Sequence, residues 1–113
     1  MANRALALRL NDILEAIERI RSVISGQTLQ EFERRWEQQW LVERGVQIIS
    51  EASRHLSADL KSRHPEIPWV KVAAIGSVLS HDYERISPDV IWKLATADLA
   101  VLEAACREEL ARE

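Results

Sequence analysis

Apolar residues recur at alternating spacings of four and three over the first 24 residues of the chain. The repeat forms one stripe along a helix of about five turns, and charged residues such as Arg9 and Glu18 lie off the stripe. Gly26 follows, where a residue in the left-handed region ends a helix at little cost. The pattern predicts an amphipathic helix that ends just before Gly26. Its apolar positions are Leu6, Leu10, Ile13, Ile17, Ile20 and Ile24.

A second helical region begins with a capping signal. Thr28 and Glu31 match the pattern in which a hydroxyl accepts a bond from the amide three residues on, while the carboxylate reaches back. Phe32, Trp36 and Trp40 follow at spacings of four. The apolar face then shifts between residues 38 and 41. We therefore expect a short helix followed by a long one.

The long helix is expected to run as far as Pro65, which cannot continue it. Apolar positions recur at helical spacing from Val42 to Leu60, and the basic residues at 61, 63 and 64 suit the negative end of the helix dipole. Gly45 inside this helix costs about 1 kcal/mol relative to alanine. The glycine therefore predicts that another helix approaches closely at this point.

The remaining third of the chain predicts two more helices. Residues 65–68 read as an extended connector, and a helix follows from Trp69 through Leu79. Ser87 and Pro88 suit the N-cap and first position of the last helix, which reaches Leu110. Strand-like alternation is absent from the sequence. The prediction is an all-α fold, an antiparallel bundle of four to five helices that forms a single domain over residues 1–113.

Composition narrows the classes of partner. With 15 basic and 18 acidic residues the net charge is −3, so a nucleic-acid ligand would need a local basic patch. Cys106 is the single cysteine, which excludes a disulfide framework and a cysteine zinc site. We see no secretory signal at the N-terminus and no apolar run of membrane-spanning length. We therefore expect a cytoplasmic protein that does not enter the membrane.

His81 and the only tyrosine, Tyr83, lie two residues apart where a helix should be ending. In a structural interpretation, His81 caps the last carbonyl groups of that helix and Tyr83 fills the end of the bundle. In a functional interpretation, His81 is a general acid or base near neutral pH, and Tyr83 orients a phosphate or a sugar hydroxyl. The pattern alone leaves both open.

Other candidate residues carry weaker signals. His55 and His64 are expected to be surface residues without an acidic partner at a metal-ligand spacing. Core packing is the default for the four tryptophans, although Trp36 and Trp40 lie in a polar stretch and could mark an oligomer surface. Glu51 is expected either to pair with a basic group across the bundle or to occupy a half-exposed flank.

Four segments taken in order resemble the HepT-like members of the HEPN superfamily. They are Ile48-Ile-Ser-Glu-Ala52, Pro65-Glu-Ile-Pro-Trp69, His81-x-Tyr83 and Ile91-Trp92. The resemblance implies a dimeric, or higher oligomeric, helical bundle that acts as a toxin. Such toxins are endoribonucleases that need no metal or cofactor, and their motif is Arg, four residues, His, one residue, Tyr. The two copies of the motif face each other across the dimer cleft. The resemblance also implies a MntA-like nucleotidyltransferase antitoxin, which adenylylates the motif tyrosine.

Carried over to this chain, the motif histidine is His81 and the motif tyrosine is Tyr83, the expected modification site. The motif arginine, which would hold the RNA phosphate, falls on Gly76, and the polar residue after it on Ser77. Ser77 could bind the same phosphate, and either Arg85 or Lys71 could replace the arginine. Two hypotheses therefore stand. The protein is either a HepT-like endoribonuclease or a non-catalytic dimeric partner and substrate of the nucleotidyltransferase. Gly76 favours the second hypothesis, but the presence of both His81 and Tyr83 puts the first slightly ahead.

Overall fold

The computed structural model describes residues 4–81 and 87–112, with side chains described for residues 4–79 and 87–112. Over these ranges the chain forms helices and short turns without a strand, which confirms the all-α prediction. The elements are α1 (Arg4–Ile24), α2 (Leu29–Glu33), α3 (Trp36–Arg54), α4 (Ala58–Ser62), α5 (Trp69–His81), α6 (Pro88–Lys93), a π-helical turn η1 (Leu94–Asp98) and α7 (Leu99–Arg112). None of the helices in the described ranges is long and apolar enough to cross a membrane.

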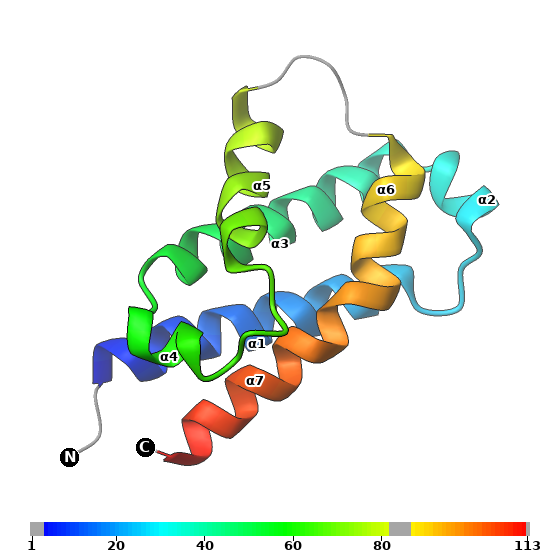
Figure 1. Ribbon diagram of the computed structural model, residues 1–113. Coiled ribbons are helices and arrows are strands. Elements are labelled where there is room, and N and C mark those ends of the chain that lie inside the picture. Colours follow the sequence, from blue (N-terminus) through cyan, green and yellow to red (C-terminus); the bar gives the residue numbers. More distant parts are fainter. Residues whose placement is uncertain (1–3, 82–86, 113) are drawn as a thin grey trace.

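The first helix confirms the prediction from the apolar stripe. α1 buries Leu10, Ile13, Ile17 and other stripe residues against α3 and α7, which lie alongside it (Figure 1). Gly26 has a φ of 75°, the left-handed conformation that ends a helix. This stripe, with the apolar faces of α3 and α7, forms the core.

The capping box at the start of α2 is present. The Thr28 amide donates to Glu31 Oε1 at 3.0 Å, and the Glu31 amide donates to Thr28 Oγ1 at 3.2 Å. The bonds that the Thr28 amide and hydroxyl donate to the Glu31 carboxylate lower its pKa. A short helix followed by a long one is also confirmed, but the break lies at Arg34 and Arg35, before the tryptophans, rather than at 38–41.

The prediction that the long helix reaches Pro65 is wrong. α3 ends at Arg54, and a new helix, α4, begins after Ser57, whose hydroxyl accepts a bond from the Leu60 amide at 3.2 Å. The apolar pattern hides this break because Leu56, inside it, and Leu60, after it, are both buried. Periodicity alone therefore could not locate it.

Gly45 confirms the close helix approach. A Cβ atom at this position would lie 2.7 Å from Cγ1 of Ile20 on α1, closer than real Cβ contacts. The glycine lets the backbone of α3 rest directly on α1, and this contact fixes the position of α3.

The prediction that His64 is a surface residue is wrong. It is 4% exposed, and its Nε2 lies 2.7 Å from Oε2 of Glu109 on α7. Arg63 donates to the same carboxylate from Nε and Nη2, at 3.1 and 2.7 Å. The Arg63 bonds, the His64 bond and the nearby charge of Arg112 lower the pKa of Glu109 to about 2. This buried cluster joins the end of α4 to α7.

His55 and Glu51 form a pair on the surface of α3. His55 is exposed as predicted, but it does have an acidic partner, because its Nε2 lies 3.3 Å from Oε1 of Glu51 one turn earlier. Of the two expectations for Glu51, pairing across the bundle is therefore wrong, and a position on the exposed flank of the helix is what the structure has. Its side chain is 63% exposed and interacts within its own helix.

The tryptophans divide into two groups. Trp69 and Trp92 are half-buried against the core, as the default interpretation predicts. Trp36 and Trp40 are 58% and 61% exposed, so the core prediction is wrong for them. Their rings pack edge to face with centroids 4.9 Å apart. They form an exposed aromatic pair at the start of α3.

Candidate functional site

Helix α5 carries most of the candidate residues. Ser77 lies on its exposed side, and His81 is its last residue, one turn further along. Positions four apart lie on the same face of a helix, so position 81 follows Ser77 on that face. Tyr83 and Arg85 lie outside the described residues.

Gly76 makes the contact between α5 and α3, the helices that cross in Figure 1. A Cβ atom at position 76 would lie 2.5 Å from Oγ and 2.7 Å from Cβ of Ser50 on α3. Ser50 fills this space with two bonds: its hydroxyl accepts from the Gly76 amide at 3.1 Å and donates to the Ala73 carbonyl at 2.8 Å. A larger residue at position 76 would have to displace Ser50. The glycine at the motif-arginine position is therefore part of this helix crossing.

Arg54, one turn after Ser50 on α3, lies over the same part of α5. Its Nη2 donates to Ser77 Oγ at 2.7 Å and to the Ala73 carbonyl at 2.9 Å, and its Nε donates to that carbonyl at 3.2 Å. All these acceptors are neutral. Among the described residues, the guanidinium is therefore held in place by neutral acceptors and forms no ion pair with a carboxylate.

These residues line a small polar hollow of about 290 Å³ between α3 and α5. Two of the lining side chains, Arg44 and Arg54, are cationic, and the carboxylate among them, Glu51, is paired with His55. We call this site the polar hollow. Its lining residues are Arg44, Gln47, Ser50, Glu51, Arg54, Gly76 and Ser77.

The sequence interpretation missed Arg54 and Arg44. A signal was present, because Arg44, Gln47, Glu51 and Arg54 recur at spacings of three and four along one face of α3. The run reads as an ordinary solvated helix face until α5 is known to cross beside it. Only the crossing at Gly76 shows that this face meets Ser77.

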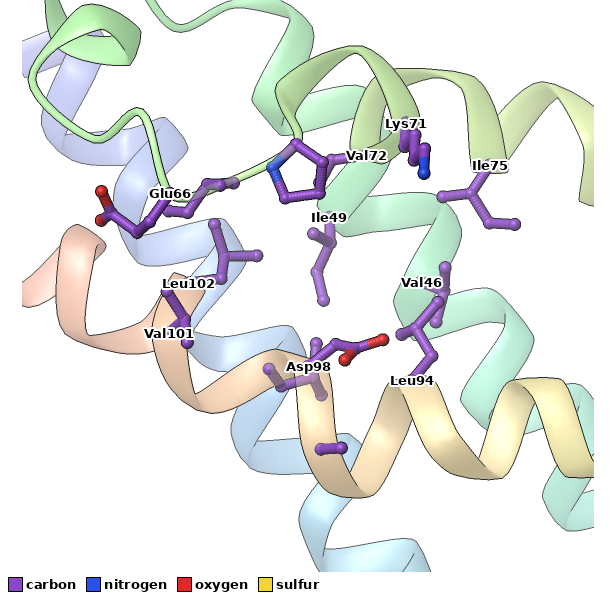
Figure 2. A pocket seen from close by; sticks show the side chains of 14 residues that line it. Val46, Ile49, Glu66, Lys71, Val72, Ile75, Leu94, Asp98, Val101 and Leu102 are labelled. Atoms are coloured by element: carbon purple, nitrogen blue, oxygen red, sulfur yellow. The ribbon is translucent and has the colours of Figure 1, made fainter.

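Lys71, proposed from the sequence as a replacement for the motif arginine, lines a different cavity from Ser77. This apolar groove of about 450 Å³ lies between α3, α5 and the η1–α7 segment (Figure 2). Figure 2 shows Lys71 on the α5 side and Asp98 on the opposite side, with Ile49 between them. The structure therefore does not bring Lys71 and Ser77 to one site.

Two further observations concern metal and thiol chemistry. Among the described residues, no three His, Cys, Asp or Glu side chains gather where they could hold a metal ion. Cys106 is 1% exposed, and burial raises the pKa of its thiol to about 12. A thiol with such a pKa is a poor nucleophile at neutral pH.

Comparison with known proteins gives a consistent family. The profile of the family described as "Ribonuclease HepT-like" matches residues 13–109. A "Probable ribonuclease HepT" from Thermococcus cleftensis is 36% identical over 94 residues, which cover 83% of this chain and 86% of that protein. A "Putative RNase" from Methanocaldococcus jannaschii is 28% identical over 99 residues, covering 88% of this chain and 91% of that protein. No solved structure gives a significant match. The chain belongs to the HepT-like ribonuclease family.

Proposed function

We propose that this protein is a HepT-like toxin that cuts RNA without a metal ion, with His81 and Tyr83 at its active site. The observation that carries the proposal is the joint occurrence of family membership and of a His-x-Tyr pair in the sequence, whose histidine is the last residue of α5. Relatives that cover most of the chain are named as ribonucleases. His81 ends the helix whose preceding turn borders the polar hollow.

The chemistry needs only groups that the chain supplies. The imidazole of His81 takes the proton from a ribose 2′-hydroxyl, and the 2′-oxygen forms a bond to the adjacent phosphorus. The bond from phosphorus to the 5′-oxygen breaks, and that oxygen takes up a proton as it leaves. The products are a 2′,3′-cyclic phosphate and a 5′-hydroxyl. In a homodimer, His81 of one protomer would act as the base and the second copy as the acid.

Regulation is the second part of the proposal. The partner would be a MntA-like nucleotidyltransferase that transfers the adenylyl group of ATP to the hydroxyl of Tyr83. The phenol oxygen would lose its proton and form a bond to the α-phosphorus, and pyrophosphate would leave. The attached phosphodiester would carry a negative charge and occupy the place of an RNA phosphate beside His81. Tyr83 is the only tyrosine of the chain, so this proposal assigns one modification site.

The direct test of the ribonuclease proposal is incubation of the purified protein with total RNA or tRNA, beside the His81→Ala variant. We expect the wild type to degrade RNA, the variant to be inactive, and EDTA to have no effect. Equal degradation by both proteins would trace the activity to another residue or to a contaminant.

A second candidate function rests on Gly76. Without the motif arginine, the protein could be a non-catalytic dimeric partner and substrate of the nucleotidyltransferase. In that case the wild type would leave RNA intact, but Tyr83 would still be modified.

Mass spectrometry after co-expression with the nucleotidyltransferase tests the modification separately. We expect an adenylyl adduct on the peptide that contains Tyr83, and none in the Tyr83→Phe variant. An unmodified wild-type protein, or an adduct that persists in the variant, would contradict the assignment.

A further inference from the structure

The motif arginine cannot simply be accommodated at position 76 in this fold. Ser50 fills the space where a Cβ atom would lie, and its hydroxyl bonds to both the Gly76 amide and the Ala73 carbonyl. A site on this face of α5 therefore needs its cation from another element.

We infer that Arg54, on the neighbouring helix α3, binds the RNA phosphate in place of the missing motif arginine. This inference rests on the proposed ribonuclease function and names the residue that holds its substrate. The guanidinium would enter the site from across the helix crossing, and Ser77 would share the same phosphate.

The geometry of Arg54 suits this role. Bonds to the Ala73 carbonyl and the Ser77 hydroxyl fix its Nε and Nη2 atoms. In the part of the chain that the structure describes, no group accepts a bond from its Nη1, which leaves two N–H donors for a ligand. Ser77 Oγ accepts from Arg54, so its own hydroxyl hydrogen can still be donated to a phosphate oxygen. Donors from two helices thus meet at one edge of the polar hollow.

The charge balance favours an anion. Several arginines elsewhere pair with carboxylates, as Arg21 does with Glu103 and Arg63 with Glu109. Over residues 4–79 and 87–112, neither Arg54 nor Arg44 takes part in an ion pair. The polar hollow therefore carries two cations against one carboxylate, Glu51, and a phosphate is the anion that an arginine fork matches best in RNA.

Of the two alternatives from the sequence, Lys71 is placed less well, and Arg85 lies outside the described residues. Lys71 lines the apolar groove, whereas Ser77 lines the polar hollow. Arg54 touches Ser77 directly, and position 81 is one turn further along α5. A phosphate held there would lie next to the position of the proposed acid–base histidine.

Binding can be measured apart from cleavage with a fluorescein-labelled RNA whose 2′-hydroxyl groups are all methylated. This probe cannot be cut, because the attacking hydroxyl is blocked. Fluorescence anisotropy at several salt concentrations gives the slope of log Kd against log salt. Loss of one phosphate contact to a single strand lowers that slope by about 0.7 per site. We expect this decrease, with weaker binding, for Arg54→Ala and partial recovery for Arg54→Lys.

Arg19→Ala is the matched control. The Arg19 side chain is 76% exposed on α1 and pairs with Glu15. Its replacement by alanine therefore removes the same charge as Arg54→Ala, but from a surface outside the polar hollow. We expect its salt slope to equal that of the wild type. Thermal melts of all variants identify any loss of folding. If Arg54→Ala unfolds, the binding of Arg54→Lys is compared with that of the wild type instead.

Cleavage of an ordinary RNA completes the test. We expect Arg54→Ala to cut about 10²- to 10³-fold more slowly than the wild type, the loss typical of one donor to a developing anion. If Arg54→Ala binds and cuts like the wild type while His81→Ala is inactive, the phosphate assignment is wrong. Arg54 then only links α3 to α5 through its hydrogen bonds, and the ribonuclease function stands. If the wild type does not cut RNA but its binding to the probe depends on Arg54, the phosphate assignment holds and the ribonuclease function fails.

Discussion

The buried carboxylate of Glu109 gives a quantitative prediction for folding. Its side chain is 2% exposed and accepts bonds from Arg63 and His64, both beyond the end of α4. Since an ionised carboxylate only accepts, the Nε2 atom of His64 must carry the proton in this contact. The Glu109→Gln variant keeps the size of the side chain and removes its charge.

The magnitude follows from the pKa. The Glu109 carboxyl has a pKa of about 2, lowered from an ordinary value of 4.5. Each pKa unit corresponds to about 1.4 kcal/mol, so the ionised carboxylate stabilises the fold by about 3 kcal/mol at neutral pH. Because the folded pKa is depressed, this stabilisation is present above pH 4.5 and is lost as the pH falls from about 4.5 towards 2.

Urea unfolding followed by circular dichroism measures the difference. At pH 7 we expect Glu109→Gln to be about 3 kcal/mol less stable than the wild type, and the gap to shrink between pH 4.5 and 2. Glu108→Gln is the matched control, since Glu108 is exposed on the same helix and should change stability by less than about 0.5 kcal/mol. A Glu109→Gln variant as stable as the control, or a gap that does not depend on pH, would refute the reasoning.

Three further predictions concern packing, reactivity and assembly. Gly45→Ala should destabilise the fold by about 1–2 kcal/mol in urea unfolding, because the new methyl group would press on Ile20; an unchanged or higher stability would contradict that contact. Cys106 should resist iodoacetamide at pH 8 until the protein is unfolded, as read by mass spectrometry; rapid labelling of the folded protein would show that the thiol is accessible. Light scattering should give at least twice the 12.9 kDa chain mass, and a stable monomer at micromolar concentration would refute the proposed dimer.

Local signals in the sequence predicted most of the helices. The stripe in α1, the Thr28–Glu31 capping box and the Ser87–Pro88 start are set by residues within a few positions of one another. Their energetics depend on neighbours along the chain, so periodicity and capping patterns suffice to find them. The end of α3 could not be located in this way, because Leu56, inside the break, and Leu60, after it, are both buried and continue the apolar pattern.

Contacts between distant segments could not be predicted in this way. His64 and Glu109 are 45 residues apart in the sequence, and only the packing of α7 against the end of α4 brings them together. Arg54 and Ser77 meet because α3 and α5 cross at Gly76. The glycine has no side chain, so the Ser50 side chain can occupy the space beside it. The glycine was visible as a departure from the family motif, but its structural role depends on a helix 26 residues away. The roles of His81 and Tyr83 stay predictions.

The chemical groups at the ends of the RNA fragments distinguish the proposed cleavage by His81 from other mechanisms. A short labelled RNA would be incubated with the protein in EDTA, beside the same RNA with 2′-deoxy sugars, and the products identified by mass spectrometry. We expect fragments that end in a 2′,3′-cyclic phosphate and begin with a 5′-hydroxyl, no cutting of the deoxy version, and no products with His81→Ala. Cutting of the deoxy version, fragments with 5′-phosphate ends, or full activity of His81→Ala would contradict the proposed cleavage.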